Sequence, residues 1–518
     1  METQLLVPLI LAVVYISYKL LHSKYYQKNL PPSPPCLPII GHFHLLKNPF
    51  HIFISNLLEK YGPILYLRLG TRPVVVLSSP AAIKECFTKN DIIFANRPHL
   101  LMGKHLNYNF TTLIFVQYGD LWRNLRRLTT QEYLSSTRLQ MSSNIRKEEV
   151  SVVVRQMFIG CKGNFKKVEL QSIFRKLTFN MIMRIIGTQP FFQEDEMVDQ
   201  AKAKEKLMDL KSTFCVTGKF GLGDFFPFLK WVDIWRVEKV MMKLFKKRDK
   251  FLHGLINDCR TRRTNSSFSA STTREDRKEE KDNNTIIDVL LSLQESQPAY
   301  YTDNLIKGVI QVMLIAGSEA TFTTAEWAMS LLLNHPEVLN TARMEIECNV
   351  GYDRLLNETD LDKLPYLHNI IRETLRLYNL GPFGAPHESS DDCTIGGYYI
   401  PKGTLLFVNF LALHRDPKAW SEPTIFKPER FEKDRKGNEG LQWMPFGVGR
   451  RGCPGEGFAK RMLGLMLGIL IQCFDWEQLG GEMVDMTTIM ERGFILKAKP
   501  LEAMYRPSKS MFNVLSRL

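Results

Sequence analysis

The chain has 518 residues, of which 44% are hydrophobic and 24% charged, which excludes a disordered polymer or a small disulfide-stabilised domain. Its net charge of +14 suits an anionic membrane surface or an acidic protein partner, although solubility alone also explains it. No zinc-finger, helix-turn-helix or RNA-binding signature is present, so we expect no nucleic-acid partner. The nine cysteines lack CxxC spacing and the eleven histidines lack an HExxH pair, which argues against a disulfide framework or a zinc site.

The first 30 residues are predicted to form a membrane anchor. Residues 5–21 are a nearly continuous apolar run, close to the lower limit of about 17 residues for crossing a bilayer. A cleaved signal peptide would begin with basic residues, whereas this chain begins with Glu2 in place of any lysine or arginine. Basic residues within or after the run place that side in the cytosol: Lys19, Lys24 and Lys28.

Residues 31–41 contain five prolines before Gly41, and we interpret them as a stiff hinge. Residues 42–518 are then expected to form one catalytic domain. Residues 64–69 and 74–77 alternate or are β-branched around a Gly-Thr-Arg-Pro turn, which predicts a hairpin. Residues 311–327 and 463–470 are typical of helix, and residues 261–284 of an exposed linker. The predicted fold class is mainly α with a minor β-sheet region.

A glycine-rich loop at residues 445–455 carries Cys453. Four glycines precede or follow the cysteine closely, so the backbone must turn tightly before the next helix. Backbone N–H groups and a helix amino terminus both stabilise a thiolate, and Arg451 offers a cation to a carboxylate of a bound group. The alternative, a merely buried cysteine, does not explain this density of glycine and arginine.

The loop resembles the haem loop of the cytochromes P450. Its fixed FxxGxRxCxG positions are all filled, by Phe446, Gly449, Arg451, Cys453 and Gly455. Residues 373–376 resemble the ExxR helix of that family, and residues 426–431 its PERF segment. Residues 122–126 resemble the WxxxR helix, and the resemblance extends over essentially the whole chain.

The resemblance implies the cytochrome P450 fold and haem b as cofactor, with Cys453 as the thiolate ligand of the iron. It also implies a structural cluster of Glu373, Arg376 and Arg430 behind the loop. The remaining haem contacts that it implies are Trp122, Arg126, His387, Phe446 and Arg451.

Several segments are most similar to plant microsomal members, in the group of isoflavone 2′-hydroxylases and methylenedioxy-bridge (sesamin-type) synthases. These segments include residues 94–98, 386–389 and 414–417. The resemblance implies a monooxygenase in the endoplasmic reticulum membrane with a cytosolic catalytic domain. It implies electrons from an NADPH–cytochrome P450 reductase and a lipophilic plant metabolite as substrate. A non-enzymatic haem protein is the alternative from another class.

The central helix departs from the family pattern opposite the cysteine. The acid is present as Glu319, but Ala320 replaces the expected hydroxyl residue, and Thr321 is rotated from it by about 100°. We list Glu319, Ala320 and Thr321 as the catalytic positions. Three interpretations stay open. The first is ordinary hydroxylation with another proton relay, such as Ser318, and the second is ring closure or phenol coupling in which a substrate hydroxyl replaces the one missing at position 320. The third is peroxide rearrangement as in allene oxide synthases.

Substrate contacts are expected from four segments whose side chains are mostly apolar: residues 100–117, 312–324, 380–385 and 490–494.

Overall fold

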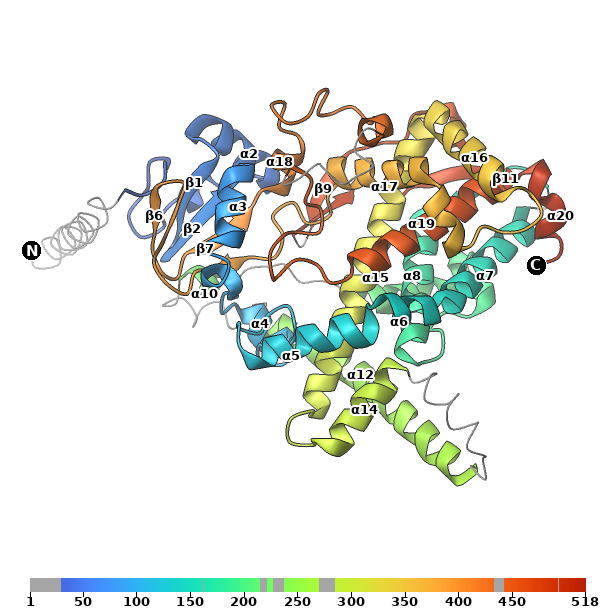
Figure 1. Ribbon diagram of the computed structural model, residues 1–518, viewed down its shortest axis with the longest axis horizontal. Helices are drawn as coiled ribbons and strands as arrows, with labels where there is room; N and C mark the ends of the chain where they lie inside the picture. The colour runs from blue at the N-terminus through green and yellow to red at the C-terminus, as the bar shows by residue number, and fades with distance from the viewer. Residues whose placement is uncertain are drawn as a thin grey trace, which may run out of the picture.

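The computed structural model describes residues 29–161, 163–214, 221–226, 237–269, 285–432, 442–491 and 493–518. The predicted membrane run lies outside the described residues, as does most of the predicted linker. The four-stranded sheet lies at one end of the molecule, while β11 (Glu502–Pro507) lies among the helices toward the opposite end, as Figure 1 shows. The mainly helical fold with a minor sheet is therefore confirmed.

The largest sheet has four strands in the order β1-β2-β7-β4. The predicted hairpin is its antiparallel β1–β2 pair, in which Ile64 faces Leu77, although β2 begins two residues earlier than predicted, at Arg72. Strand β7 then runs parallel to β2, and β4 antiparallel to β7. The strands of this sheet are β1 (Ile64–Leu69), β2 (Arg72–Leu77), β7 (Leu405–Val408) and β4 (His387–Glu388).

The proline-rich segment is bound to this sheet over its described length. The backbone N–H of Tyr66 in β1 donates to the carbonyl of Pro32 over 2.9 Å, and Gly41 bridges to Leu69. Just before the segment, the carbonyl of Asn29 accepts the N–H of Tyr399 over 2.7 Å, from strand β6 (Tyr398–Ile400) of a separate two-stranded sheet. The hinge therefore lies along the sheet edge instead of standing free of it.

Three smaller sheets complete the β-structure. Strands β3, β11 and β8 form an antiparallel sheet near the carboxyl end, while β5–β6 and β9–β10 are two-stranded. Their bounds are β3 (Lys166–Glu169), β5 (Cys393–Ile395), β6 (Tyr398–Ile400), β8 (Phe474–Gln478), β9 (Thr488–Glu491), β10 (Phe494–Lys497) and β11 (Glu502–Pro507).

Helix α15 (Asp303–Asn334) is the central element of the helical part. With 32 residues it is about 48 Å long, and the hydroxyl of Thr302 caps its amino end by accepting the N–H of Leu305. It is the one described helix long and apolar enough to cross a membrane, but most of it is buried in the protein. Its length and apolar character therefore reflect its place in the core.

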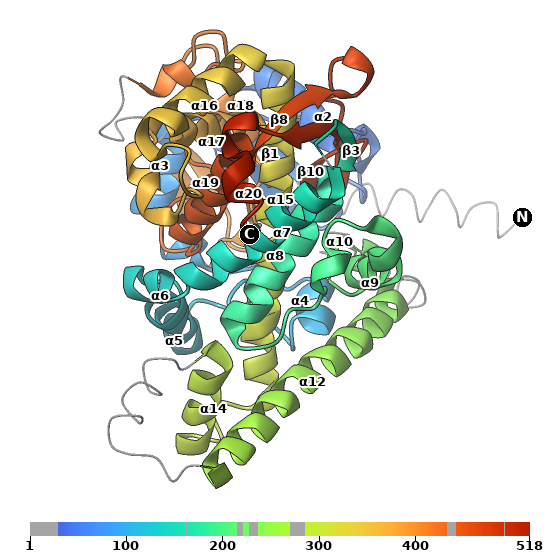
Figure 2. The same ribbon diagram turned by 90° about the vertical axis from the view of Figure 1, so that its right-hand side faces the viewer.

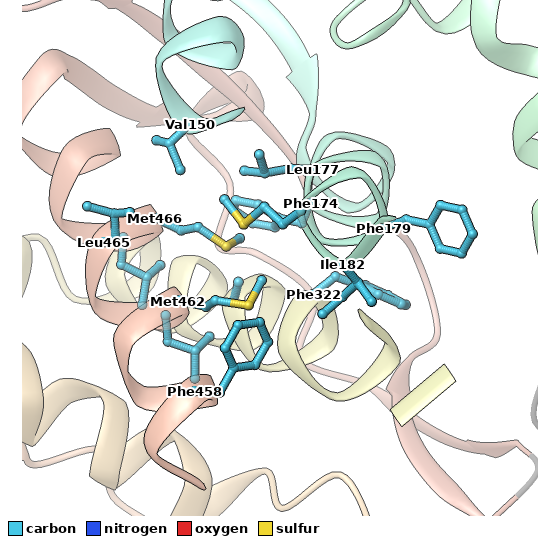
Figure 3. Close-up of a cluster of buried hydrophobic side chains, with 14 of the residues drawn as sticks. Val150, Phe174, Leu177, Phe179, Ile182, Phe322, Phe458, Met462, Leu465 and Met466 are labelled. Carbon is cyan, nitrogen blue, oxygen red and sulfur yellow. The ribbon is translucent and has the colours of Figure 1, made fainter. Parts of the chain in front are cut away.

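Three helices pack around α15 to form the core. Figure 3 shows side chains of α7 (Ser143–Cys161), α8 (Leu170–Ile186), α15 and α19 (Glu456–Cys473) converging, with Phe174, Phe322 and Met462 between the helices. These side chains are almost fully buried. Tight packing of apolar side chains from distant segments is the main stabilising contribution expected for such a core.

The other helices surround this core. Figure 2 shows α12 crossing the lower part of the molecule diagonally. Helix α12 continues to Ser269, so the first part of the predicted linker is helical. The remaining α-helices are α2 (Phe50–Tyr61), α3 (Pro80–Thr88), α4 (Leu101–Leu106), α5 (Asp120–Leu128), α6 (Ser136–Met141), α9 (Gln200–Thr213), α10 (Leu222–Phe225), α12 (Lys239–Ser269), α14 (Ile286–Ser296), α16 (Pro336–Val350), α17 (Pro365–Leu377), α18 (Phe410–His414) and α20 (Phe512–Leu515).

Short 3-10 and π-helical turns connect these elements. The π-helical turn η3 extends α5, and the 3-10 turn η8 carries the segment that resembles the PERF motif. These turns are η1 (Phe43–Leu45), η2 (Ile93–Ala95), η3 (Thr129–Tyr133), η4 (Glu194–Glu196), η7 (Glu358–Lys363), η8 (Pro428–Phe431), η10 (Leu479–Gly481) and η11 (Lys509–Met511).

Candidate functional site

A cavity of about 450 Å³ lies between α15, α5, the cysteine loop and the start of α19. Most residues that line it are apolar, and its size is within the range of small-molecule and cofactor pockets. It brings together six of the sequence-predicted site residues that resemble haem contacts: Trp122, Arg126, His387, Phe446, Arg451 and Cys453.

The cysteine loop presents its thiol to this cavity. The backbone N–H of Cys453 donates to the carbonyl of Phe446 over 2.8 Å, and the N–H of Gly455 donates to Cys453 Sγ over 3.3 Å. Helix α19 begins at the next residue, Glu456. The backbone therefore offers the sulfur one N–H donor and a helix amino terminus, as the sequence predicts.

The environment of Cys453 has opposing effects on its acidity. Burial raises the pKa of the thiol, while the N–H of Gly455 and the positive charge of Arg126 oppose that increase. The sulfur is surrounded by protein but open to the cavity, which accounts for its exposure. A thiol of raised pKa deprotonates when a metal ion coordinates it, because the metal charge outweighs the cost of burial.

One wall of the cavity carries three arginines. Arg126 Nη1 donates to the carbonyl of Gly452 over 2.7 Å and so contacts the cysteine loop directly. Arg451 donates to the carbonyls of Ala95, Leu113 and Val116 over 2.6–3.1 Å, and its guanidinium lies 4.8 Å from the ring of Trp122. Arg97, the third, is almost fully buried.

Arg97 is the main cavity residue that sequence reasoning missed. Its Nη1 donates to the carbonyls of Ala385 and Pro386 over 2.8 Å, and its Nε to Ile114 over 3.2 Å. The residue belongs to a segment that the sequence marked only as typical of plant family members, and that resemblance was the available signal.

The three arginines give this wall of the cavity a concentration of positive charge. Within the described part of the chain, none of Arg97, Arg126 and Arg451 forms an ion pair with a carboxylate. Burial lowers the pKa of Arg97 to about 10 and that of Arg451 to about 9, the latter also by repulsion from Arg97 and Arg126. Buried cations of this kind are stabilised by an anionic ligand.

His387 completes this wall from strand β4. Its Nδ1 lies 2.7 Å from the carbonyl of Phe94, and its ring packs edge-on against Phe87. Burial, and then repulsion from Arg97, lower its pKa well below the ordinary value. His387 is therefore neutral near pH 7 and donates from Nδ1 to that carbonyl.

An iron porphyrin fits these residues. Its apolar ring suits the apolar cavity, a thiolate suits its iron, and its carboxylates suit the unpaired arginines. In the described residues, no group of three or more His, Cys, Asp or Glu side chains could hold a bare metal ion. The chemistry of the donors therefore agrees with a cofactor that carries its own iron ligands and needs one more from the protein.

Behind the loop, the predicted cluster of Glu373, Arg376 and Arg430 is present. Glu373 Oε2 accepts from Arg376 Nε over 2.7 Å, and Oε1 accepts from Arg430 Nε over 2.9 Å. Glu373 and Arg376 are completely buried. These side chains do not line the cavity, which agrees with a structural role.

The distal wall is formed by one stripe of α15. Ala316, Gly317, Ala320, Thr321 and Thr324 line the cavity at helical spacing. The hydroxyl of Thr321 donates to the carbonyl of Gly317, and that of Thr324 to Ala320, each over 2.8 Å. Thr321 thus faces the cavity although it is rotated from Ala320, but its proton is directed into the helix.

Glu319 and Ser318 lie away from the cavity lining. Glu319 Oε1 accepts from Arg175 Nη1 of α8 over 2.6 Å, and the Arg175 guanidinium stacks 3.9 Å from the ring of Phe322. The hydroxyl of Ser318 donates to the carbonyl of Leu314. The structure therefore brings Ala320 and Thr321 to the cavity, while Glu319 lies outside the cavity lining, bound to Arg175.

Each segment predicted to contact substrate contributes to the cavity. In chain order, the four segments contribute the following lining residues: Leu113 and Ile114; Val312 and its neighbours on α15; residues 380, 381 and 383–385; and Phe494. Met490 instead packs among other apolar side chains. Asn379, whose side chain accepts the N–H of Gly381 over 3.1 Å, adds a polar group to an otherwise apolar wall.

Comparison with known proteins agrees with this geometry. The family model for cytochrome P450 matches residues 31–504. The chain is 47% identical to cytochrome P450 81Q32 of Catharanthus roseus, over 100% of this chain and 99% of the relative. It is 45% identical to an isoflavone 2′-hydroxylase of Glycyrrhiza echinata, over 92% of each. It is 43% identical to a (+)-piperitol/(+)-sesamin synthase of Sesamum radiatum, over 98% of this chain and 96% of the relative.

Proposed function

The chain belongs to the cytochrome P450 family of haem-thiolate monooxygenases, and on that premise we propose that it hydroxylates a carbon atom of a lipophilic plant specialised metabolite. Proteins of this family take electrons from a redox partner and act on small substrates. The observation that carries the proposal is the apolar cavity that opens onto Cys453 on one side and onto α15 on the other. The relatives of the chain include an isoflavone 2′-hydroxylase, an enzyme that by its name hydroxylates an isoflavone.

Cys453 is the proposed ligand of the haem iron, and Arg97, Arg126, Arg451 and His387 are proposed to hold the haem carboxylates. The bound haem supplies oxygen activation, which a thiolate ligand favours by donating electron density to iron. The N–H of Gly455 holds the sulfur in place, and the apolar wall excludes water from the reacting carbon. The protein thus orients the substrate and tunes the cofactor through these contacts.

Ring closure to a methylenedioxy bridge, or phenol coupling, is the second candidate. The observation that favours it is Ala320, which leaves a methyl group at the centre of the distal stripe, with the nearest hydroxyls bonded to helix carbonyls. A substrate hydroxyl beside Ala320 would then be the available proton donor on this wall. A sesamin synthase is among the relatives of the chain, which supports this candidate further.

The proposed redox partner is an NADPH–cytochrome P450 reductase, and the proposed location is the endoplasmic reticulum membrane, with residues 1–30 as a single-pass anchor and a cytosolic catalytic domain. Helix α5 carries exposed Arg123 and Arg127 on either side of Arg126, which contacts the cysteine loop. A positive surface this close to the cofactor suits an acidic electron donor. The overall net charge of +14 agrees with such a partner.

Replacing the proposed ligand tests the cofactor assignment. Cys453→Ala removes the sulfur, so the reduced protein with carbon monoxide should lose the absorbance band of thiolate-ligated haem, and turnover should stop. Cys348→Ala removes an exposed cysteine on α16 and should leave both unchanged. Retention of the thiolate band in Cys453→Ala would refute the assignment. Product analysis with flavonoids, methoxyphenols and triterpenes then identifies the substrate class.

A further inference from the structure

We propose that Asp91 is a positioning residue for the cysteine loop, which it clamps by binding both the backbone and the side chain of Arg450. The inference rests on the proposed role of Cys453 and adds a second anchor to the buried Glu373 cluster behind the loop. Asp91 lies between α3 and η2, far from Arg450 in sequence.

Two groups of Arg450 converge on the carboxylate of Asp91. Arg450 Nε donates to Asp91 Oδ2 over 2.5 Å, and the backbone N–H of Arg450 faces Asp91 Oδ1 at 3.4 Å. Both side chains are partly shielded, with 16% of Asp91 and 32% of Arg450 exposed. The pair therefore fixes the backbone and the side chain of the residue three positions before Cys453.

Tyr118 supports the same clamp from the segment before α5. Arg450 Nη1 donates to the Tyr118 hydroxyl over 2.7 Å, and the guanidinium lies 5.0 Å from the centre of its ring. The guanidinium of Arg123 lies 5.4 Å from the centre of the same ring. Asp91 is thus the negative charge that offsets Arg450 where two arginines approach one tyrosine.

The preceding glycine shows how closely the loop approaches Asp91. Gly449 has φ of +75°, and a Cβ added there would lie 3.0 Å from Asp91 Oδ1 and 3.2 Å from Phe87 Cβ. The carbonyl of Gly449 accepts the N–H of Gly452, which closes the turn leading to Cys453. A larger residue at 449 would push Asp91 away, so glycine and clamp require each other.

Residues 91–95 hold two successive loop arginines. Asp91 binds Arg450, and the carbonyl of Ala95 accepts from Arg451 Nε over 2.8 Å. At the start of the loop, the N–H of Met444 donates to His414 Nε2 over 3.0 Å. The loop is therefore fixed at both ends, and loss of Asp91 removes one of the contacts that hold the end carrying the thiol. The position of the sulfur, and hence its bond to iron, should become variable.

The test measures the rate at which thiolate-ligated haem converts to thiol-ligated haem in the full-length protein, reduced and bound to carbon monoxide. The measurement is made in mild guanidinium chloride, well below the melting temperature. We expect Asp91→Ala and Arg450→Ala each to convert at least about tenfold faster, as expected for loss of a charge-assisted hydrogen bond. Asp91→Asn should fall between Asp91→Ala and the wild type, because it keeps an acceptor for the backbone N–H. The control, Asp391→Asn, removes an exposed carboxylate that binds a neighbouring backbone N–H.

The double variant Asp91→Ala, Arg450→Ala should convert no faster than Arg450→Ala alone, because Arg450→Ala already removes the side-chain pair with Asp91 together with the contact to Tyr118. The proposal would be overturned if the effects of the two single variants on the conversion rate added up in the double variant. It would also be overturned if both Asp91 variants converted at a rate close to that of the wild type. A lower melting temperature of the polypeptide with an unchanged conversion rate would also overturn it, since that is a purely structural effect. If Asp91→Ala does not fold, the rate of Asp91→Asn decides. Absence of the thiolate band in the wild type would instead overturn the proposed function itself.

Discussion

The substitution Glu373→Gln keeps the size of the side chain and removes its charge, so it isolates the electrostatic contribution of the buried cluster. Glu373 accepts two hydrogen bonds from Arg376, over 2.7 and 2.8 Å, one from Arg430 over 2.9 Å and one from the N–H of Lys427 over 3.0 Å. In glutamine, one of the two oxygens becomes an NH₂ group, which faces the guanidinium donors and repels them. Arg376 has no solvent exposure, so water cannot replace the lost acceptor.

Removing one partner of a buried ion pair typically costs about 3–5 kcal/mol, a large fraction of the total stability of about 5–15 kcal/mol of a folded protein. We therefore expect Glu373→Gln to lower the melting temperature and to yield mostly protein without thiolate-ligated haem. The assay combines thermal melting by circular dichroism with the haem-thiolate content per mole of protein. Glu429→Gln is the matched control, because Glu429 is exposed on η8 and accepts from the Tyr366 hydroxyl. Wild-type melting and haem content in Glu373→Gln would refute this reasoning.

Three further variants probe the cavity and its surroundings. Ala320→Thr adds a hydroxyl to the stripe of α15 that lines the cavity, and it should raise the ratio of hydroxylated to ring-closed or coupled product. An unchanged product mixture would show that residue 320 does not determine which product forms. Burial lowers the pKa of His414 from 6.5 to about 3, so the folded state binds fewer protons than the unfolded state between these values. Stability is complete above pH 6.5 and falls on acidification by up to about 1.4 kcal/mol per pH unit for this group. His414→Gln should reduce that slope, measured as melting temperature between pH 4 and 6.5, and an equal slope would contradict the assignment. Arg97→Gln removes an unpaired buried cation and should speed haem loss to a competing haem-binding protein without changing the fold; an unchanged loss rate would show that Arg97 does not hold the cofactor.

The features that the sequence predicts correctly have local signals. Alternating β-branched residues identify the β1–β2 hairpin, and glycines around Cys453 identify a turn before α19. The Glu373 cluster follows from its resemblance to family motifs. In each case the determining residues lie within a few positions of one another, or match a motif of fixed spacing.

The features that the sequence does not predict depend on distant partners. Arg97 reaches the cavity because its guanidinium binds carbonyls 288 and 289 residues away, at Ala385 and Pro386. Glu319 turns from the cavity because Arg175, 144 residues earlier, lies beside α15 on α8. Thr321, one of the catalytic positions named from the sequence, reaches the cavity despite its rotation from Ala320 because the cavity covers a broad stripe of the helix. Such pairings are set by the packing of whole helices.

The sheet order β1-β2-β7-β4 has a mechanical consequence. One edge strand, β1, is hydrogen-bonded to the proline-rich segment through Tyr66 and Pro32, while the other edge strand, β4, carries His387 of the cavity wall. A force applied to the proline-rich segment at Pro32 is thus passed across four hydrogen-bonded strands to the wall that faces the arginines. The proline-rich segment is therefore attached to the cavity wall through a hydrogen-bonded plate, and a pull on that segment reaches His387 through the sheet.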